Sequence, residues 1–166
     1  MRHKESDLQI RCVRWFRVTY PAFARLLEHP RNEGNDSSAR DRRRSTIAKK
    51  EGVMAGVADL ILHLPAEFRS KEGDITNVTV FTALAIEMKT KTGRQSPGQK
   101  LWQRYFEAAG GKYVIVRSFE EFEHEVAPYM CGIPSQISYN VKVLHDQIEQ
   151  ENADAAKKEL ERIINE

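Results

Sequence analysis

The sequence contains few cysteines and no long apolar run. Its two cysteines, Cys12 and Cys131, are too few for a disulfide framework or a zinc knuckle, so we expect two buried or partly buried free thiols. No stretch approaches the about 20 apolar residues that cross a bilayer, and the N-terminus lacks the apolar core of a signal peptide. These absences argue against membrane-spanning and disulfide-rich secreted proteins, and they predict a cytoplasmic protein that does not contact a membrane.

Charge is unevenly distributed along a chain that is otherwise typical of one globular domain. The chain is 40% hydrophobic and 30% charged, and its 166 residues are enough for a core plus an appendage. The net charge of +2 is made up of +7 over residues 1–50, +2 over residues 51–118 and −7 over residues 119–166. A basic N-terminal part suits a phosphate backbone. A phosphate backbone would repel the acidic tail over residues 119–166, so we expect this tail to lie away from nucleic acid or against another protein.

Hydrophobic periodicity and turn-forming residues predict alternating helices and strands. Helices are expected over residues 4–19, 46–52, 98–109, 118–130 and 140–165. Strands are expected over residues 59–64, 78–90 (one long strand or two joined ones) and 112–117, with a short turn or strand over 20–27. Loops are expected over residues 28–45, 65–77 and 91–98, and a Gly/Pro/Ser connector over 132–139. The strand–helix–strand unit from residue 85 to 117 should have parallel strands with a right-handed crossover, giving an α/β sheet.

One short motif places opposite charges inside an apolar strand. Residues i and i+2 of a strand share a face, so Glu87 and Lys89 project together while Ile86 and Met88 face the other side. Asp59 opens another apolar strand and supplies a second carboxylate. Carboxylates are the hard ligands that Mg²⁺ or Mn²⁺ prefers, and the backbone carbonyl of Met88 could add another. Such a set beside a lysine suits phosphodiester hydrolysis, although Glu-x-Lys by itself is common and usually means an exposed salt bridge.

In its context the motif resembles the VRR-NUC family, a branch of the PD-(D/E)xK nuclease superfamily. The resemblance runs from Glu5 to about Phe119 and rests on stretches in the family's order, namely Glu5-Ser-Asp-Leu-Gln9, Gly52 with Gly56-Val-Ala-Asp59, Ile86-Glu-Met-Lys89, Ser96-Pro-Gly-Gln99 and the last core strand from Gly110 to Ser118. Two features depart from the family. Ala58 replaces the usual proline, and the interval of 28 residues between Asp59 and Glu87 is long, which an inserted loop over 65–77 would explain.

The resemblance implies both a fold and a set of site residues. The fold would be a restriction-endonuclease-like PD-(D/E)xK core, with a central mixed β-sheet flanked by helices over residues 1–131, followed by a connector and a C-terminal helix over residues 132–166. Asp59 and Glu87 would be metal ligands, and Lys89 would be the catalytic lysine. Glu5 would project toward the metal and could serve a second ion, and Gln99 would lie at the active site. Alternatively, Glu5 is a solvated helix carboxylate and Gln99 a polar residue at a helix start.

Basic side chains near these motifs are candidate phosphate contacts. They are Arg40, Arg42, Arg43, Arg44, Lys49, Lys50, Lys91, Arg94 and Lys100. The alternative for the run over residues 40–50 is a solvated loop. The histidines show no metal-ligand spacing and are expected at the surface or packed, and Trp15 and Trp102 are expected in the core.

The implied function is that of a Mg²⁺- or Mn²⁺-dependent DNA endonuclease. Family resemblance suggests branched substrates such as Holliday junctions or flaps, and a homodimer that the helix over residues 140–165 could join. A compact chain of this kind fits a bacterial or phage-infected cell. Two alternatives stay open. One is a nuclease-like fold that binds DNA without cutting it, and the other is an enzyme that needs a partner recruited through the acidic tail.

Overall fold

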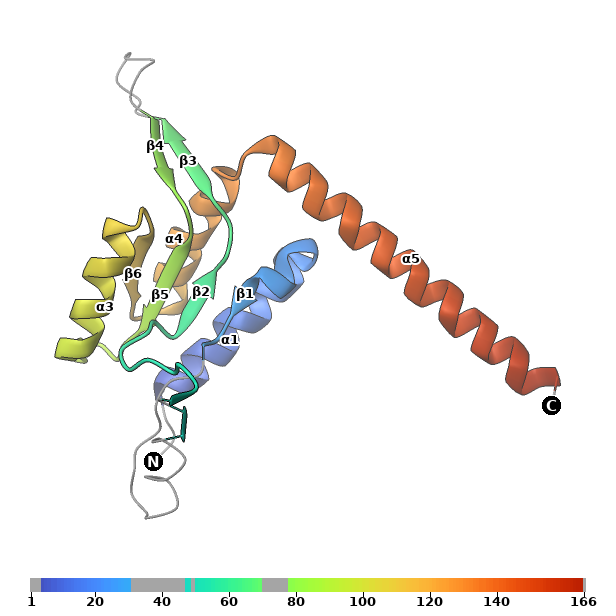
Figure 1. The fold of residues 1–166 in the computed structure, drawn as a ribbon, viewed down its shortest axis with the longest axis horizontal. Helices are drawn as coiled ribbons and strands as arrows, with labels where there is room; N and C mark the ends of the chain where they lie inside the picture. Colours follow the sequence, from blue (N-terminus) through green and yellow to red (C-terminus); the bar gives the residue numbers. More distant parts are fainter. Residues whose placement is uncertain (1–3, 31–46, 49, 70–77, 166) are drawn as a thin grey trace.

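A mixed α/β architecture organises the chain, as the sequence predicts. The computed structural model describes residues 4–30, 47–48, 50–69 and 78–165 (Figure 1). The helices are α1 (Lys4–Thr19), the 3-10 helix η1 (Pro21–Leu26), α3 (Pro97–Ala108), α4 (Phe119–Cys131) and α5 (Ser135–Asn165). The strands are β1 (Leu27–Glu28), β2 (Leu60–Leu62), β3 (Ala66–Arg69), β4 (Val78–Phe81), β5 (Leu84–Met88) and β6 (Lys112–Val116).

The main sheet has the strand order β1-β2-β5-β6. Strand β2 runs antiparallel to both β1 and β5, whereas β5 and β6 are parallel and are connected through α3. The predicted strand–helix–strand unit is therefore confirmed, and the sheet is mixed. Because β2 and β5 are antiparallel, the start of β2 and the end of β5 lie at the same end of the sheet.

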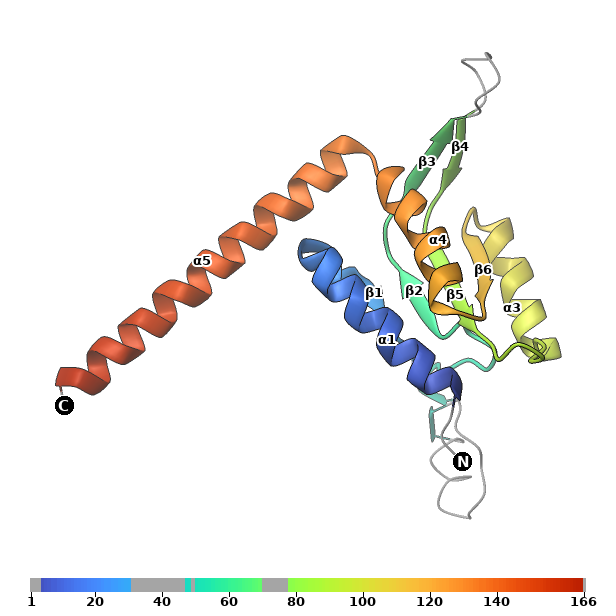
Figure 2. The ribbon, with the colours of Figure 1, turned by 180° about the vertical axis from the view of Figure 1, so that it is seen from behind.

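Helices cover both faces of this sheet (Figures 1 and 2). On one face, Cys12 and Phe16 of α1 and Phe122 of α4 pack with Ile86 and other residues of the sheet. On the other face, Trp102 and Phe106 of α3 pack against Ala58, Ala85 and Tyr113. The five residues of β5 are all buried, and its side chains alternate between the two cores. Both tryptophans lie in packed aromatic groups, as predicted.

The predicted loop over residues 65–77 is wrong at its start. Ala66–Arg69 form β3, which pairs antiparallel with β4 in a separate two-stranded sheet. In this strand Ala66 is buried, Glu67 is exposed, and Phe68 packs edge-on against Phe81 at 5.7 Å between ring centroids. The hairpin extends from the end of the main sheet opposite Asp59, and it accounts for the long interval before Glu87.

Three further predictions need correction. Residues 21–26 form a 3-10 helix, with β1 following directly at Leu27. Helix α5 begins at Ser135, within the predicted connector, because Pro134 accepts the first helical hydrogen bond from the Ser138 N–H. Cys131 is exposed at the last residue of α4, although Cys12 is buried as expected. Of the predicted helix over residues 46–52, residues 47, 48 and 50 are helical, and residues 46 and 49 lie outside the described part of the chain.

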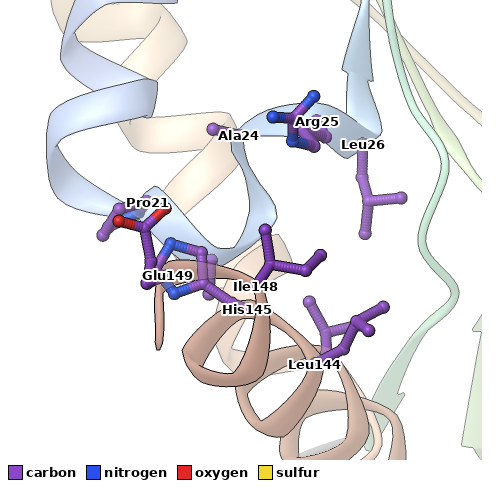
Figure 3. Close-up of a pocket in the computed structure, with 10 residues that line it drawn as sticks. Pro21, Ala24, Arg25, Leu26, Leu144, His145, Ile148 and Glu149 are labelled. Carbon is purple, nitrogen blue, oxygen red and sulfur yellow. The ribbon is translucent and has the colours of Figure 1, made fainter. Parts of the chain in front are cut away.

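Helix α5 projects away from the rest of the molecule (Figure 2). Its first half contacts η1, and between them lies a cavity of about 250 Å³ lined largely by apolar side chains such as Leu26, Leu144 and Ile148 (Figure 3). Every residue from 149 to 159 is exposed. No helix among the described residues is long and apolar enough to cross a membrane.

A glycine allows the turn before β2 to lie against the start of α3. Gly56 has a φ of 85°, and a Cβ atom there would lie 2.5 Å from the carbonyl carbon of Gly98 and 2.8 Å from the nitrogen of Gln99. Only glycine tolerates both this backbone conformation and this approach. The contact sets the segment that carries Asp59 beside the helix that carries Gln99.

We expect Gly56→Ala to destabilise the protein by more than Gly52→Ala. Gly52 also has a positive φ, of 95°, but a Cβ atom there meets nothing within 4 Å. Both variants therefore lose about 1–2 kcal/mol to the left-handed backbone, and Gly56→Ala alone also displaces the start of α3. Denaturant unfolding of the two variants measures the difference. Equal destabilisation would show that the close approach of Gly56 to Gly98 does not matter.

Candidate active site

The register between β2 and β5 brings Asp59 to Glu87. Leu60 lies opposite Ile86, and extending this antiparallel register by one residue sets Asp59 opposite Glu87. The Met88 N–H donates a hydrogen bond of 2.7 Å to Asp59 Oδ2, which holds the carboxylate at the end of β5. Two carboxylates that are 28 residues apart in the sequence are thus neighbours.

Glu87 is a fully buried charged residue with three side-chain partners. Its exposed fraction is 0%, and Lys89 Nζ lies 2.5 Å from its Oε1. Gln99 Nε2 donates to the same oxygen, and the Tyr113 hydroxyl donates to Oε2 at 3.1 Å. The alternative of an exposed salt bridge is therefore excluded for the Glu87–Lys89 pair, because both residues are buried.

Gln99 connects the start of α3 to this carboxylate. The Ser96 hydroxyl accepts a hydrogen bond from the Gln99 N–H at 3.2 Å, and Gln99 Oε1 accepts one from the Ser96 N–H at 2.8 Å. This reciprocal pair is a capping box, which satisfies two backbone donors at the helix start. The remaining amide nitrogen of Gln99 then points at Glu87. At the start of α4, by contrast, the Ser118 hydroxyl accepts from the Glu121 N–H, but Glu121 Oε2 accepts from the Arg117 N–H, so no reciprocal pair forms.

Glu5 reaches the same end of the sheet from α1. Its Oε1 accepts a hydrogen bond of 2.8 Å from the N–H of Thr90, the residue after Lys89. Among the described residues, no three His, Cys, Asp or Glu side chains converge closely enough to enclose a metal ion. The site is therefore a pair of carboxylates, Asp59 and Glu87, beside one lysine, with Glu5 held at the adjoining backbone.

Burial makes both paired carboxylates reluctant to ionise. Loss of solvent is the largest cause that raises the pKa of Asp59, and the Met88 N–H and Lys89 oppose it. Burial likewise raises the pKa of Glu87, the Lys89 hydrogen bond opposes that rise, and the charge of Asp59 adds to it. A nearby positive charge would favour the ionised form of both carboxyl groups and lower their pKa values. Mg²⁺ commonly binds through one or two carboxylates, with water and substrate oxygens completing its shell, so this donor pair fits it.

The predicted phosphate-binding residues are described only in part. Lys91, Arg94 and Lys100 are exposed in the segment between Lys89 and the first turns of α3, close to the site in sequence. Lys50 is exposed and helical, just before the turn at residues 51 and 52. The remaining five predicted cations lie outside the described residues, namely Arg40, Arg42, Arg43, Arg44 and Lys49.

Two residues of the site had no predicted role. Tyr113 lies within the stretch that carries the family resemblance, and its signal is a polar-tipped ring in an otherwise apolar strand. His29 was expected at the surface or packed, and it is exposed, but its Nδ1 lies 2.6 Å from the backbone carbonyl oxygen of Asp59. Gln9 Nε2 lies 3.0 Å from the same ring nitrogen. No spacing rule links His29 to Asp59, because only the β1–β2 pairing brings them together.

A mixed sheet with Asp59, Glu87 and Lys89 at one end is the architecture of restriction-endonuclease-like, nuclease-type DNA-processing proteins. The family model of the VRR-NUC domain matches residues 3–120. Since that span is most of the chain, the protein belongs to the VRR-NUC family, as its motifs predict.

A solved structure described as a VRR_NUC domain protein is similar, with a TM-score of 0.57 and 17% sequence identity. The match covers 77% of this chain and 88% of that one, and at this identity it shows the fold alone. No curated protein matches the chain.

We expect the metal-free protein to lose stability as the pH rises above about 4, the ordinary pKa of carboxyl groups. Asp59 and Glu87 hold protons more tightly in the folded state than in the unfolded chain. Their contribution to stability is therefore complete below the unfolded pKa and is lost as the pH passes the raised folded pKa. Melting temperatures measured in EDTA across this window test the sign.

Two variants separate this effect from the rest of the titration. Glu87→Gln cannot ionise and should flatten the decline. Glu125→Gln removes a carboxylate paired with Lys112 at 2.8 Å outside the site, and it should leave the decline in place. Identical pH profiles for the wild type and Glu87→Gln would contradict the assignment.

Proposed function

We propose that the protein is a metal-dependent DNA endonuclease that hydrolyses phosphodiester bonds. The observation that carries the proposal is the buried Glu87–Lys89 pair with Asp59 beside it at the sheet end. A buried ion pair adds little net stability, because apolar residues of similar size often stabilise a protein as much. Retaining a lysine and two carboxylates at this position is better explained by chemistry.

In the proposed reaction Asp59 and Glu87 hold Mg²⁺ or Mn²⁺, and the Met88 carbonyl and Glu5 are candidate further ligands. The bound ion would neutralise phosphate charge and lower the pKa of water. Lys89 has three N–H donors, one of which serves Glu87, so two remain for the phosphate oxygens as negative charge develops on them. Gln99 keeps Glu87 in place through the capped start of α3.

DNA is the proposed substrate, with branched DNA such as a junction or a flap preferred. Family membership supports DNA, and the exposed cations Lys91, Arg94 and Lys100, which follow Lys89 in the sequence, are candidate phosphate contacts. Residues 40–50 are proposed to extend this basic surface. The preference for branched DNA follows from the likeness to the family.

Cleavage assays with branched, nicked and linear DNA test the function. We expect cutting with Mg²⁺ or Mn²⁺, none in EDTA, and a rate reduced by about 100-fold or more in Glu87→Gln, since the carboxylate pair would be broken. Glu125→Gln is the matched control, because it alters an ion-paired carboxylate away from the site. Binding without cutting under every metal condition would favour a DNA-binding module, and cutting that survives Glu87→Gln would refute the site.

We also propose that two copies associate through α5. Helices of this length are stabilised mainly by packing, yet the residues from 149 to 159 are all exposed in one copy. A two-fold dimer would present two sites to two strands, which suits a symmetric junction.

Light scattering at micromolar concentration should therefore give twice the mass of 19.1 kDa for the full chain. A chain that ends at Gln150 lacks the exposed part of the helix and should give the monomer mass. A monomeric full chain would exclude the dimer without affecting the catalytic proposal.

A further inference from the structure

The hydroxyl of Tyr113 occupies the one oxygen of Glu87 that Lys89 and Gln99 leave free. Tyr113 lies in β6, is 9% exposed and packs with Ala58 and Ala85 under α3. Its hydroxyl donates to Glu87 Oε2 at 3.1 Å. Burial is the largest cause that raises the pKa of Tyr113, so the hydroxyl keeps its proton and remains a donor.

The chemistry of the two groups sets the direction of this donation. An ionised carboxylate has acceptor positions only, whereas the protonated phenol has one O–H donor. The phenol proton is therefore directed at Glu87 Oε2.

Counting the acceptor positions of Glu87 shows what the phenol controls. An ionised carboxylate has about four lone-pair positions, two on each oxygen. Among the described residues, Lys89 and Gln99 take both positions on Oε1, and Tyr113 takes one on Oε2. One position on Oε2 is therefore left by these three partners, and it is the position that a cation bound to Glu87 would use. The direction in which that position faces is set by the Tyr113 hydrogen bond.

We propose that Tyr113 is a positioning residue that orients the Glu87 carboxylate for cation binding through Oε2. The inference rests on the proposed role of Glu87 as a metal ligand. Tyr113 itself touches neither the cation nor the DNA in this account. Its contribution is to fix the orientation of Oε2 while Lys89 and Gln99 hold the other oxygen. Groups of this kind, which bond to a ligand rather than to the metal, typically contribute 10- to 100-fold to metal affinity or activity.

The chain offers a matched control for the loss of one buried phenol. Tyr129 is 0% exposed, and its hydroxyl donates to the backbone carbonyl of Leu64 at 2.8 Å, away from the site. Tyr113→Phe and Tyr129→Phe therefore each delete one buried hydroxyl and one hydrogen bond while keeping the ring. Both should lower the melting temperature, so loss of stability alone cannot produce a difference between them in metal binding.

Calorimetric titration of the full chain with Mn²⁺ in the absence of DNA is the first measurement. We expect Tyr113→Phe to weaken Mn²⁺ binding by about 10- to 100-fold, and Tyr129→Phe to bind as the wild type does. In cleavage assays at saturating Mn²⁺, Tyr113→Phe should lower kcat with little change in KM for DNA. Wild-type Mn²⁺ affinity and kcat in Tyr113→Phe would overturn the inference, as would equal losses in both variants.

Glu87→Gln, titrated in parallel, distinguishes this failure from failure of the proposed function. If Mn²⁺ binding survives Glu87→Gln, Glu87 is not a ligand and the proposed metal site falls. If Glu87→Gln loses Mn²⁺ binding while Tyr113→Phe retains it, the metal site stands and the role of Tyr113 alone is refuted.

Discussion

The arrangement of the sheet end depends on one constraint, which is that the carboxylate of Glu87 is fully buried. A buried charge is tolerated only when partners replace the water it has lost. Here the partners come from separate parts of the chain, namely Lys89 just after β5, Gln99 at the start of α3 and Tyr113 in β6. The sheet, its crossover helix and the following strand must therefore be assembled together for Glu87 to be stable.

The two faces of the sheet have different tasks. Toward α1 and α4, β5 presents Ile86 and Met88 to an apolar core that supplies most of the packing. Toward α3 it presents a smaller apolar group and then the polar residues of the site. The close approach of Gly56 to Gly98 lets the turn before Asp59 and the start of α3 meet at this second face. The packing free energy of the apolar core on the first face can offset the electrostatic cost of the buried charges on the second face.

The raised pKa values of Asp59 and Glu87 link this arrangement to chemistry. Each carboxylate is penalised by burial, and the charge of Asp59 adds to the penalty on Glu87. Lys89 offsets part of the cost but carries only one charge for two carboxylates. In the proposed function, a divalent cation would supply the remaining positive charge. The long helix α5 stands outside this coupling, since it contacts the body through η1.

Spacing within single segments determined much of the site from the sequence alone. The two-residue period of a strand places Glu87 and Lys89 on one face whatever surrounds them. The helical pattern between β5 and β6 indicated a crossover helix joining parallel strands. Other features required tertiary contacts. The register of β2 on β5 set Asp59 beside Glu87, and strand pairing brought His29 to the Asp59 carbonyl. The β3–β4 hairpin was hidden because four residues with weak alternation form a strand only when a partner strand is present. Tyr113 became part of the site because β6 lies beside β5 in space, and no local periodicity records which residues of two separate strands will meet.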